Sequence, residues 1–121
     1  MSEMKKDLPE RTFQLAIRIV ELCRFLEQQG KVSRTLANQL LRSGTSIGAN
    51  VEEGQGAQSE ADFLTKYSIA CKEARETYYW VRLLAATNLV DDLRLADLRE
   101  ECNQIIAILT AIIKKLKAKR S

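Results

Sequence analysis

The sequence predicts an antiparallel four-helix bundle whose helices run up, down, up and down. Glycine and proline, which interrupt helices, number only five and one among 121 residues, and the proline stands at position 9. Apolar residues recur at alternating steps of three and four, which is the spacing of left-handed helix packing. The segments between these stripes are short, so consecutive helices should be antiparallel neighbours within one domain, residues 1–121.

The first helix is predicted over about residues 9–29. Pro9 suits a first helical turn, because proline lacks the backbone N–H that would be unpaired there, and Gly30 ends the helix. The segment carries two apolar lines, namely Phe13, Ala16, Val20 and Cys23 on one and Leu15, Ile19, Leu22 and Leu26 on the other. A bundle helix needs a single apolar face. We therefore expect the line of Leu15, Ile19, Leu22 and Leu26 to contact other subunits; the alternative is a wide core face.

The second helix is predicted over about residues 33–53, with Ser33 as its N-cap. Its larger apolar residues form one stripe, which consists of Leu36, Leu40, Ile47 and Val51. Gly44 and Gly48 line up beside that stripe, and each costs about 1 kcal/mol in a helix interior relative to alanine. We expect both to let a neighbouring helix backbone approach closely, since the added dispersion contacts offset this cost. A hinge is the alternative.

The third helix is predicted over about residues 59–87. Ser59 is a good N-cap and is followed three residues later by the acid Asp62, while Asn88 can adopt the left-handed conformation that closes a helix. Further apolar residues lie off the main stripe of this helix, and we take three of them as part of a subunit interface: Tyr79, Trp80 and Leu83.

The fourth helix is predicted over about residues 92–117, after the Asp91–Asp92 pair, whose charge suits a helix N-terminus. Its apolar stripe is unbroken and consists of Leu95, Leu98, Cys102, Ile105, Leu109, Ile112 and Leu116. A basic tail over residues 114–121 follows, with Lys114, Lys115, Lys117, Lys119 and Arg120 and no acid. Such a tail is able to bind phosphate. The alternative is that it complements the helix dipole and keeps the end solvated.

Composition excludes several classes of function. No apolar run is long enough to span a membrane, and the first ten residues lack the core of a signal peptide. Three cysteines, an odd number without a CxxC motif, favour a reduced, cytoplasmic protein. Histidine is absent, which removes the commonest general base and metal ligand. We therefore expect no enzymatic activity, no metal and no cofactor.

Two stretches carry a resemblance to a known family: RSGTSIGANVEEGQG at 42–56 and SEADFLTKYSIACKEARETYYWVRLL at 59–84. They resemble the four-helix-bundle proteins encoded in intervening sequences of 23S ribosomal RNA genes. The matching residues are Ser46, Ile47, Asn50, Glu53, Gly54, Phe63, Ile69, Ala70 and Glu76. Many relatives have Gly-Ser where this chain has Lys72 and Glu73.

The resemblance implies an up-and-down bundle that assembles into a ring, typically a pentamer. One branch of the family comprises accessory proteins of diversity-generating retroelements, which bind nucleic acid and a reverse transcriptase. The partners implied for this chain are therefore further copies of itself, RNA or DNA, and a reverse transcriptase or another protein.

The motif residues Ser46, Ile47, Asn50, Glu53, Gly54 and Glu76 are interpreted as structural. Glu53 is expected to accept hydrogen bonds from the start of the third helix, while Gly54 takes a left-handed closing turn. The alternative is that Glu53 binds a partner or acts in catalysis. Ser46 and Asn50, four residues apart, are expected to bond across a helix interface or to the end of the next helix.

The net charge of +3 is unevenly distributed. We predict a non-enzymatic homo-oligomer that binds nucleic acid weakly through phosphates, using the basic tail with help from Arg34 and Arg42. Because the exposed aromatics are few beyond Tyr79 and Trp80, the sequence argues against a base-stacking platform. The alternative is a protein scaffold or adaptor that uses Tyr79, Trp80 and the acidic pair Glu52–Glu53.

Overall fold

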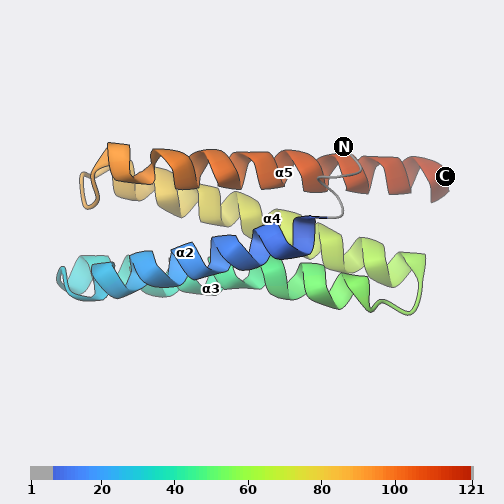
Figure 1. Ribbon diagram of the computed structural model, residues 1–121, viewed down its shortest axis with the longest axis horizontal. Helices are drawn as coiled ribbons and strands as arrows, with labels where there is room; N and C mark the ends of the chain where they lie inside the picture. Colours follow the sequence, from blue (N-terminus) through green and yellow to red (C-terminus); the bar gives the residue numbers. More distant parts are fainter. Residues whose placement is uncertain (1–6, 121) are drawn as a thin grey trace.

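The computed structural model describes residues 7–120 and consists of four helices. They are α2 (Leu8–Glu27), α3 (Lys31–Gln55), α4 (Glu60–Ala86) and α5 (Asp92–Arg120). Figure 1 shows them as one antiparallel bundle, with α2 and α3 side by side, α4 between them and α5, and α5 along the opposite side. The predicted fold is confirmed. Residues 1–6 and Ser121, which the sequence assigns to the domain and to the basic tail, lie outside the described residues.

Three consecutive helix pairs pack closely, whereas α2 and α5 contact each other much less. The main polar contact between α2 and α5 is the bidentate ion pair of Arg11 with Glu101. The Arg11 Nε and Nη2 atoms donate to the two Glu101 carboxylate oxygens at 3.0 and 2.7 Å. This geometry is the strong form of a charge-assisted hydrogen bond, so it holds the least packed seam of the bundle together.

The helix ends follow the predicted signals at two places. Ser59 Oγ accepts the backbone N–H of Asp62 at 3.0 Å and caps α4, as predicted. Asn88 adopts the left-handed conformation with a φ of 59° and turns the chain after α4, also as predicted.

The predicted N-cap at Ser33 is wrong. Helix α3 begins earlier, at Lys31, because Gly30 adopts a φ of 116° that other residues rarely reach. Gly30 therefore ends the turn after α2 and starts α3, and Ser33 is buried inside the first turn of the helix.

The two glycines of α3 allow close contact with α2, as predicted. A Cβ atom at Gly44 would lie 2.7 Å from Cγ2 of Ile19, and one at Gly48 would lie 3.3 Å from the backbone oxygen of Thr12. Because both neighbours belong to buried residues of α2, side chains at either position would push the two helices apart. The glycines thus set the distance between α2 and α3.

Candidate interaction surfaces

The basic tail is the last part of α5 rather than a loose extension, since the helix continues to Arg120. Two of its cations face the first turn of α4: Lys119 Nζ lies 2.9 Å from Glu60 Oε2, and Arg120 Nη1 lies 3.9 Å from Glu60 Oε1. Lys114 and Lys115 are exposed and have no ion-pair or hydrogen-bond partner within residues 7–120. Of the predicted phosphate contacts in this segment, these two remain fully available.

The two predicted arginines of α3 differ from each other. Arg34 is exposed and has no acidic partner among the described residues. Arg42 reaches across to α4, where Nη1 lies 3.3 Å from Glu73 Oε2 and Nη2 contacts Glu76 Oε2. Two carboxylates thus engage the Arg42 guanidinium. Arg42 therefore links α3 to α4, and its predicted contact with phosphate stays a prediction, since its side chain is still 48% exposed.

The family motif of α3 forms contacts inside its own helix. Ser46 Oγ donates to the carbonyl oxygen of Arg42 at 2.7 Å, and Asn50 Nδ2 donates to that of Ser46 at 2.9 Å. The prediction that Ser46 and Asn50 bond across an interface is therefore wrong within residues 7–120. Ile47 is fully buried in the core. These contacts agree with the structural role that the sequence assigns to them.

The acidic end of α3 differs from the prediction in its details. Glu53 Oε1 accepts from the ammonium group of Lys66, in the second turn of α4, at 2.8 Å, and this contact raises the pKa of Lys66. Gly54 stays helical, so the predicted left-handed turn is wrong. A Cβ atom there would lie 2.6 Å from Cε1 of Tyr67. Gly54 is needed because it makes room for that buried ring.

The predicted interface residues on α2 are wrong. All four of them lie in the core of the single chain, with at most 7% of each exposed: Leu15, Ile19, Leu22 and Leu26. The other apolar side of α2 faces solvent, with exposed fractions of 58% for Phe13, 39% for Ile17 and 38% for Val20. Of the line that begins at Phe13, Phe13 and Val20 are exposed, whereas Cys23 is buried in the core.

The exposed side of α2 continues onto α3. Leu41 is 39% exposed, and a shallow groove between the two helices is lined by Phe13, Ala16, Thr45, Gly48 and Ala49 together with Pro9 and Glu52. We call Phe13, Ile17, Val20 and Leu41, with this groove, the α2–α3 face. Exposed apolar residues gathered in this way typically mark an interaction surface.

The predicted interface residues on α4 are accessible to different degrees. Tyr79 is 53% exposed, whereas Trp80 and Leu83 are half-buried. The Trp80 indole donates from Nε1 to Glu76 Oε2 at 2.9 Å, and the Tyr79 ring packs against it edge-on, with ring centroids 5.0 Å apart. These aromatic rings are held in place by Glu76, a motif residue.

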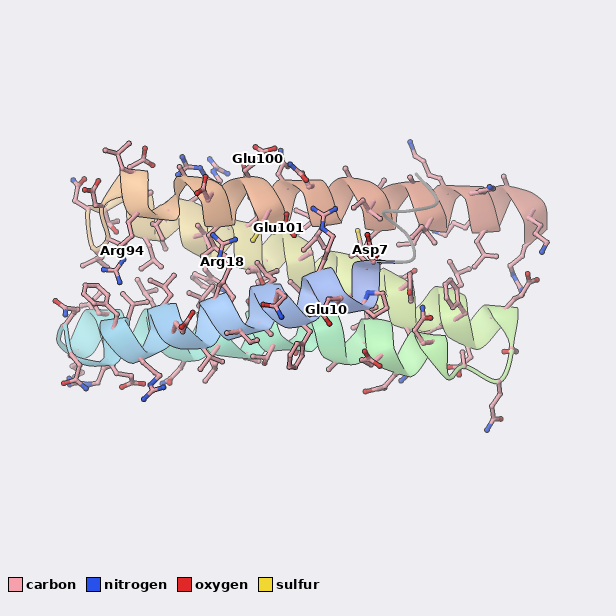
Figure 2. The ribbon with its side chains drawn as sticks, in the orientation of Figure 1. Asp7, Glu10, Arg18, Arg94, Glu100 and Glu101 are labelled. Atoms are coloured by element: carbon pink, nitrogen blue, oxygen red, sulfur yellow. The ribbon has the colours of Figure 1, made fainter. Side chains whose placement is uncertain are left out.

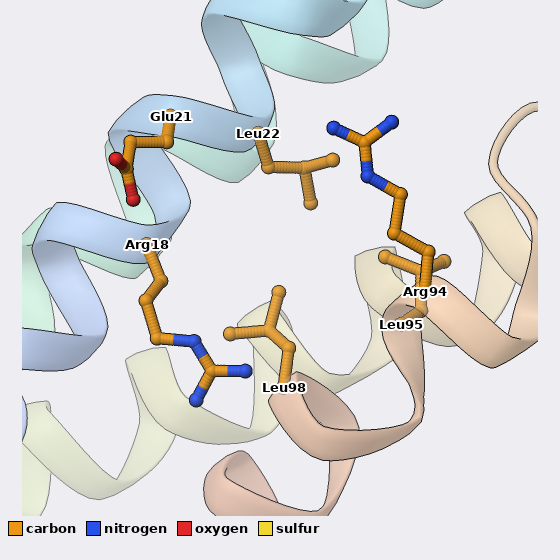
Figure 3. Close-up of a pocket in the computed structure, with 6 residues that line it drawn as sticks. All are labelled: Arg18, Glu21, Leu22, Arg94, Leu95 and Leu98. Atoms are coloured by element: carbon orange, nitrogen blue, oxygen red, sulfur yellow. The ribbon is translucent and has the colours of Figure 1, made fainter.

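A second groove lies along the weakly packed seam between α2 and α5. Figure 2 shows Arg18 and Arg94 there, and Figure 3 shows Leu22 and Leu98 between them, with Leu95 beside Arg94 and Glu21 above Arg18. The Arg94 guanidinium carbon lies 4.3 Å from the centroid of the Phe25 ring. Because the long stems of arginine cover apolar surface while the charge stays in water, these side chains shield the core where the bundle is least closed.

Nothing in the described part of the chain points to catalysis. It contains no group of three or more histidine, cysteine or acidic residues that would hold a metal ion. Burial raises the pKa of the Cys23 thiol to about 11 and that of the Cys102 thiol to about 12. Since the thiolate is the reactive form, both thiols are inert at neutral pH.

The buried Cys102 thiol should make the fold less stable in alkali. Its pKa is about 12 in the folded protein against an ordinary value of 9.0. A group whose pKa is raised by folding contributes its full stabilisation at pH values below its pKa in the unfolded state. This stabilisation is lost as the pH rises above that pKa, because only the unfolded state then releases the proton. Between pH 9 and pH 11 we expect the free energy of unfolding to fall by up to about 1.4 kcal/mol per pH unit from this thiol. Urea denaturation across this range should show a shallower fall for Cys102→Ala, and equal slopes would contradict the prediction.

Within residues 7–120, no helix has the length and apolar character that crossing a membrane requires. A comparison with curated proteins finds no significant match.

The family model for 23S rRNA-intervening sequence proteins matches residues 5–111. The chain is also similar to the crystal structure, at 1.70 Å resolution, of a protein of unknown function from the S23 ribosomal protein family of Bacteroides thetaiotaomicron. The two are 42% identical, with a TM-score of 0.82, and the match covers 88% of this chain and 98% of that one. Both the sequence motif and the bundle agree with this relationship, and the chain therefore belongs to the family of 23S rRNA-intervening sequence proteins.

Proposed function

We propose that this protein is a non-enzymatic homo-oligomer that binds nucleic acid weakly through backbone phosphates. The proposal of nucleic-acid binding is based on a set of exposed cations that have no acidic partner among the described residues. Those that the sequence already indicated are Arg34, Lys114 and Lys115. Cations that lack a partner are free to replace the counterions of a nucleic acid, which is the main source of sequence-independent affinity.

Assembly would multiply these contacts. A few lysines on one chain bind a polyanion weakly, but linked copies bind the same strand with a much higher effective concentration. The α2–α3 face supplies a surface for assembly, because it exposes three large apolar side chains of α2 beside an apolar groove. A ring of five is the number that the family resemblance implies, and a ring needs a contact that repeats head to tail.

Disrupting the α2–α3 face should break the oligomer. We expect light scattering to find an oligomer for the parent chain and a monomer for Phe13→Asp/Ile17→Asp, because two buried carboxylates without partners cost several kcal/mol at an interface. Leu93→Asp is the matched control, since Leu93 is 84% exposed and lies outside this face. A monomeric parent at micromolar concentration would refute the assembly.

Neutralising the unpaired lysines of α5 should weaken binding to every sequence alike. For Lys114→Gln/Lys115→Gln we expect the slope of log affinity against log salt on duplex DNA to become shallower by about 1.8, from two phosphate contacts of roughly 0.9 each. Lys66→Gln is the control, since Glu53 already neutralises Lys66. Fluorescence anisotropy at several salt concentrations measures both slopes. If the parent chain binds no nucleic acid even at low salt, the protein scaffold or adaptor function replaces this one.

A further inference from the structure

The outward face of α4 carries a row of three cations that the sequence does not single out, together with Tyr79, which it assigns to a subunit interface. Lys72, Arg75, Tyr79 and Arg82 follow one another at steps of three, four and three, which places them on one side of the helix. All four are exposed, while the core residues of α4 lie on the opposite side. We call these four residues the α4 stripe. It spans about 15 Å along the helix.

The charge of the α4 stripe is not compensated within residues 7–120. None of its three cations forms an ion pair there; the Arg82 guanidinium carbon lies 5.9 Å from the centroid of the Tyr78 ring. The acids in the same segment point elsewhere, since Arg42 engages both Glu73 and Glu76. The stripe is therefore a positive surface directed at solvent.

Tyr79 stands in the middle of the α4 stripe as a fixed ring. Its packing against Trp80, at an interplanar angle of 74°, orients it, and the hydrogen bond from Trp80 to Glu76 fixes the indole. Beside the tyrosine lies a hollow of about 170 Å³, lined by Tyr79, Arg82, Leu83 and Ala86. Its lining combines an aromatic ring, two aliphatic side chains and a guanidinium group, which together suit a planar base attached to a phosphate.

We propose that the α4 stripe binds single-stranded nucleic acid, with phosphates on Lys72, Arg75 and Arg82 and one base in the hollow against Tyr79. This deepens the proposed function and rests on it. In a duplex the bases are stacked on one another and are not free to enter a side hollow, whereas a single strand can turn one out. The sequence argued against a stacking platform because its exposed aromatics are few, but a single base needs only one ring.

The base contact is tested by anisotropy with labelled RNA and DNA, each as a single strand and as a duplex of equal length. Tyr79→Ala should weaken binding to single strands about tenfold, as expected for the loss of one stacked base, and should leave duplex binding unchanged. Tyr79→Phe keeps the ring and should bind like the parent.

The phosphate contacts are tested through the salt dependence of single-strand binding. Arg75→Gln/Arg82→Gln should make the salt slope shallower by about 1.4, from two contacts of about 0.7 each. Arg24→Gln is the matched control, because Arg24 is also exposed and unpaired in the described residues but lies on α2. Light scattering should find the same oligomer for every variant.

The possible failures are distinguishable. If the parent binds no nucleic acid at low salt, the proposed function fails, and this inference fails with it. If the parent binds but Tyr79→Ala binds single strands as tightly, the base contact is refuted while phosphate binding stands. If Arg75→Gln/Arg82→Gln leaves the salt slope unchanged or alters the oligomer, the stripe is not the phosphate surface.

Discussion

Replacing Gly44 with leucine should lower the free energy of unfolding by about 1–3 kcal/mol, although leucine is the better helix former by nearly 1 kcal/mol. Even the first atom of the new side chain would lie 2.7 Å from Cγ2 and 2.9 Å from Cγ1 of Ile19. Ile19 is fully buried and cannot swing into solvent. The α2 and α3 helices must therefore separate, or Ile19 must leave its preferred rotamer.

The matched control is Gly56→Leu. Gly56 follows α3 with a φ of −96°, and a Cβ atom there would come no closer than 3.9 Å to the atoms around it. Urea denaturation at one protein concentration should show little change for this variant. Ile19→Ala removes the obstructing atoms, so the double variant with Gly44→Leu should lose less stability than the two single changes add up to. A Gly44→Leu chain as stable as the parent would refute close packing at Gly44.

The helices were predictable because each carries a local signal. Alternating steps of three and four between apolar residues mark a helix whatever it packs against, and Ser59 and Asn88 act on their own immediate backbone. The same signal does not tell which of two apolar lines is buried. On α2 the lines of Leu15 and of Phe13 have similar spacing, and only the positions of the other helices put Leu15 inside and Phe13 outside.

The errors at glycines have a similar origin. Gly54 follows two acids at the end of a helical pattern, so the sequence around it resembles a terminus. Its actual neighbour is the ring of Tyr67, which lies in the next helix. Local sequence also offered Ser33 as a cap, whereas the positive φ of Gly30 decides where α3 begins. Conformation and close contact both favour glycine, and the sequence alone does not separate them.

The candidate surfaces were less predictable than the fold, because a cation is available only if no acid reaches it. In the sequence Arg42 stands among residues without acids, and Lys119 belongs to an acid-free tail. In the bundle Arg42 meets Glu73 and Glu76 of α4, and Lys119 meets Glu60. These pairs depend on how helices pack side by side, so the sequence overestimates the free charge of α3 and α5 and misses that of α4.

Replacing Arg42 with alanine should lower the free energy of unfolding by about 1–3 kcal/mol, because it leaves a buried acid without its partner. The Glu73 side chain is only 11% exposed, against 48% for Arg42 and 31% for Glu76. The ion pair of Arg42 with Glu76 is the more exposed of the two, and it contributes little to stability, as surface ion pairs generally do. Most of the cost comes from Glu73, which would keep its burial, lose its cation and face the like charge of Glu76 one turn away.

Arg34→Ala is the control, since Arg34 lies on the same helix but is exposed and has no acidic partner among the described residues. Urea denaturation should show no more than a small change for this variant. Adding Glu73→Gln to Arg42→Ala should restore part of the stability, because a neutral amide costs less to bury without a partner than a carboxylate does. An Arg42→Ala chain as stable as the Arg34→Ala chain would mean that Arg42 does not support Glu73. Its guanidinium would then be free to bind phosphate after all, as the sequence alone indicates.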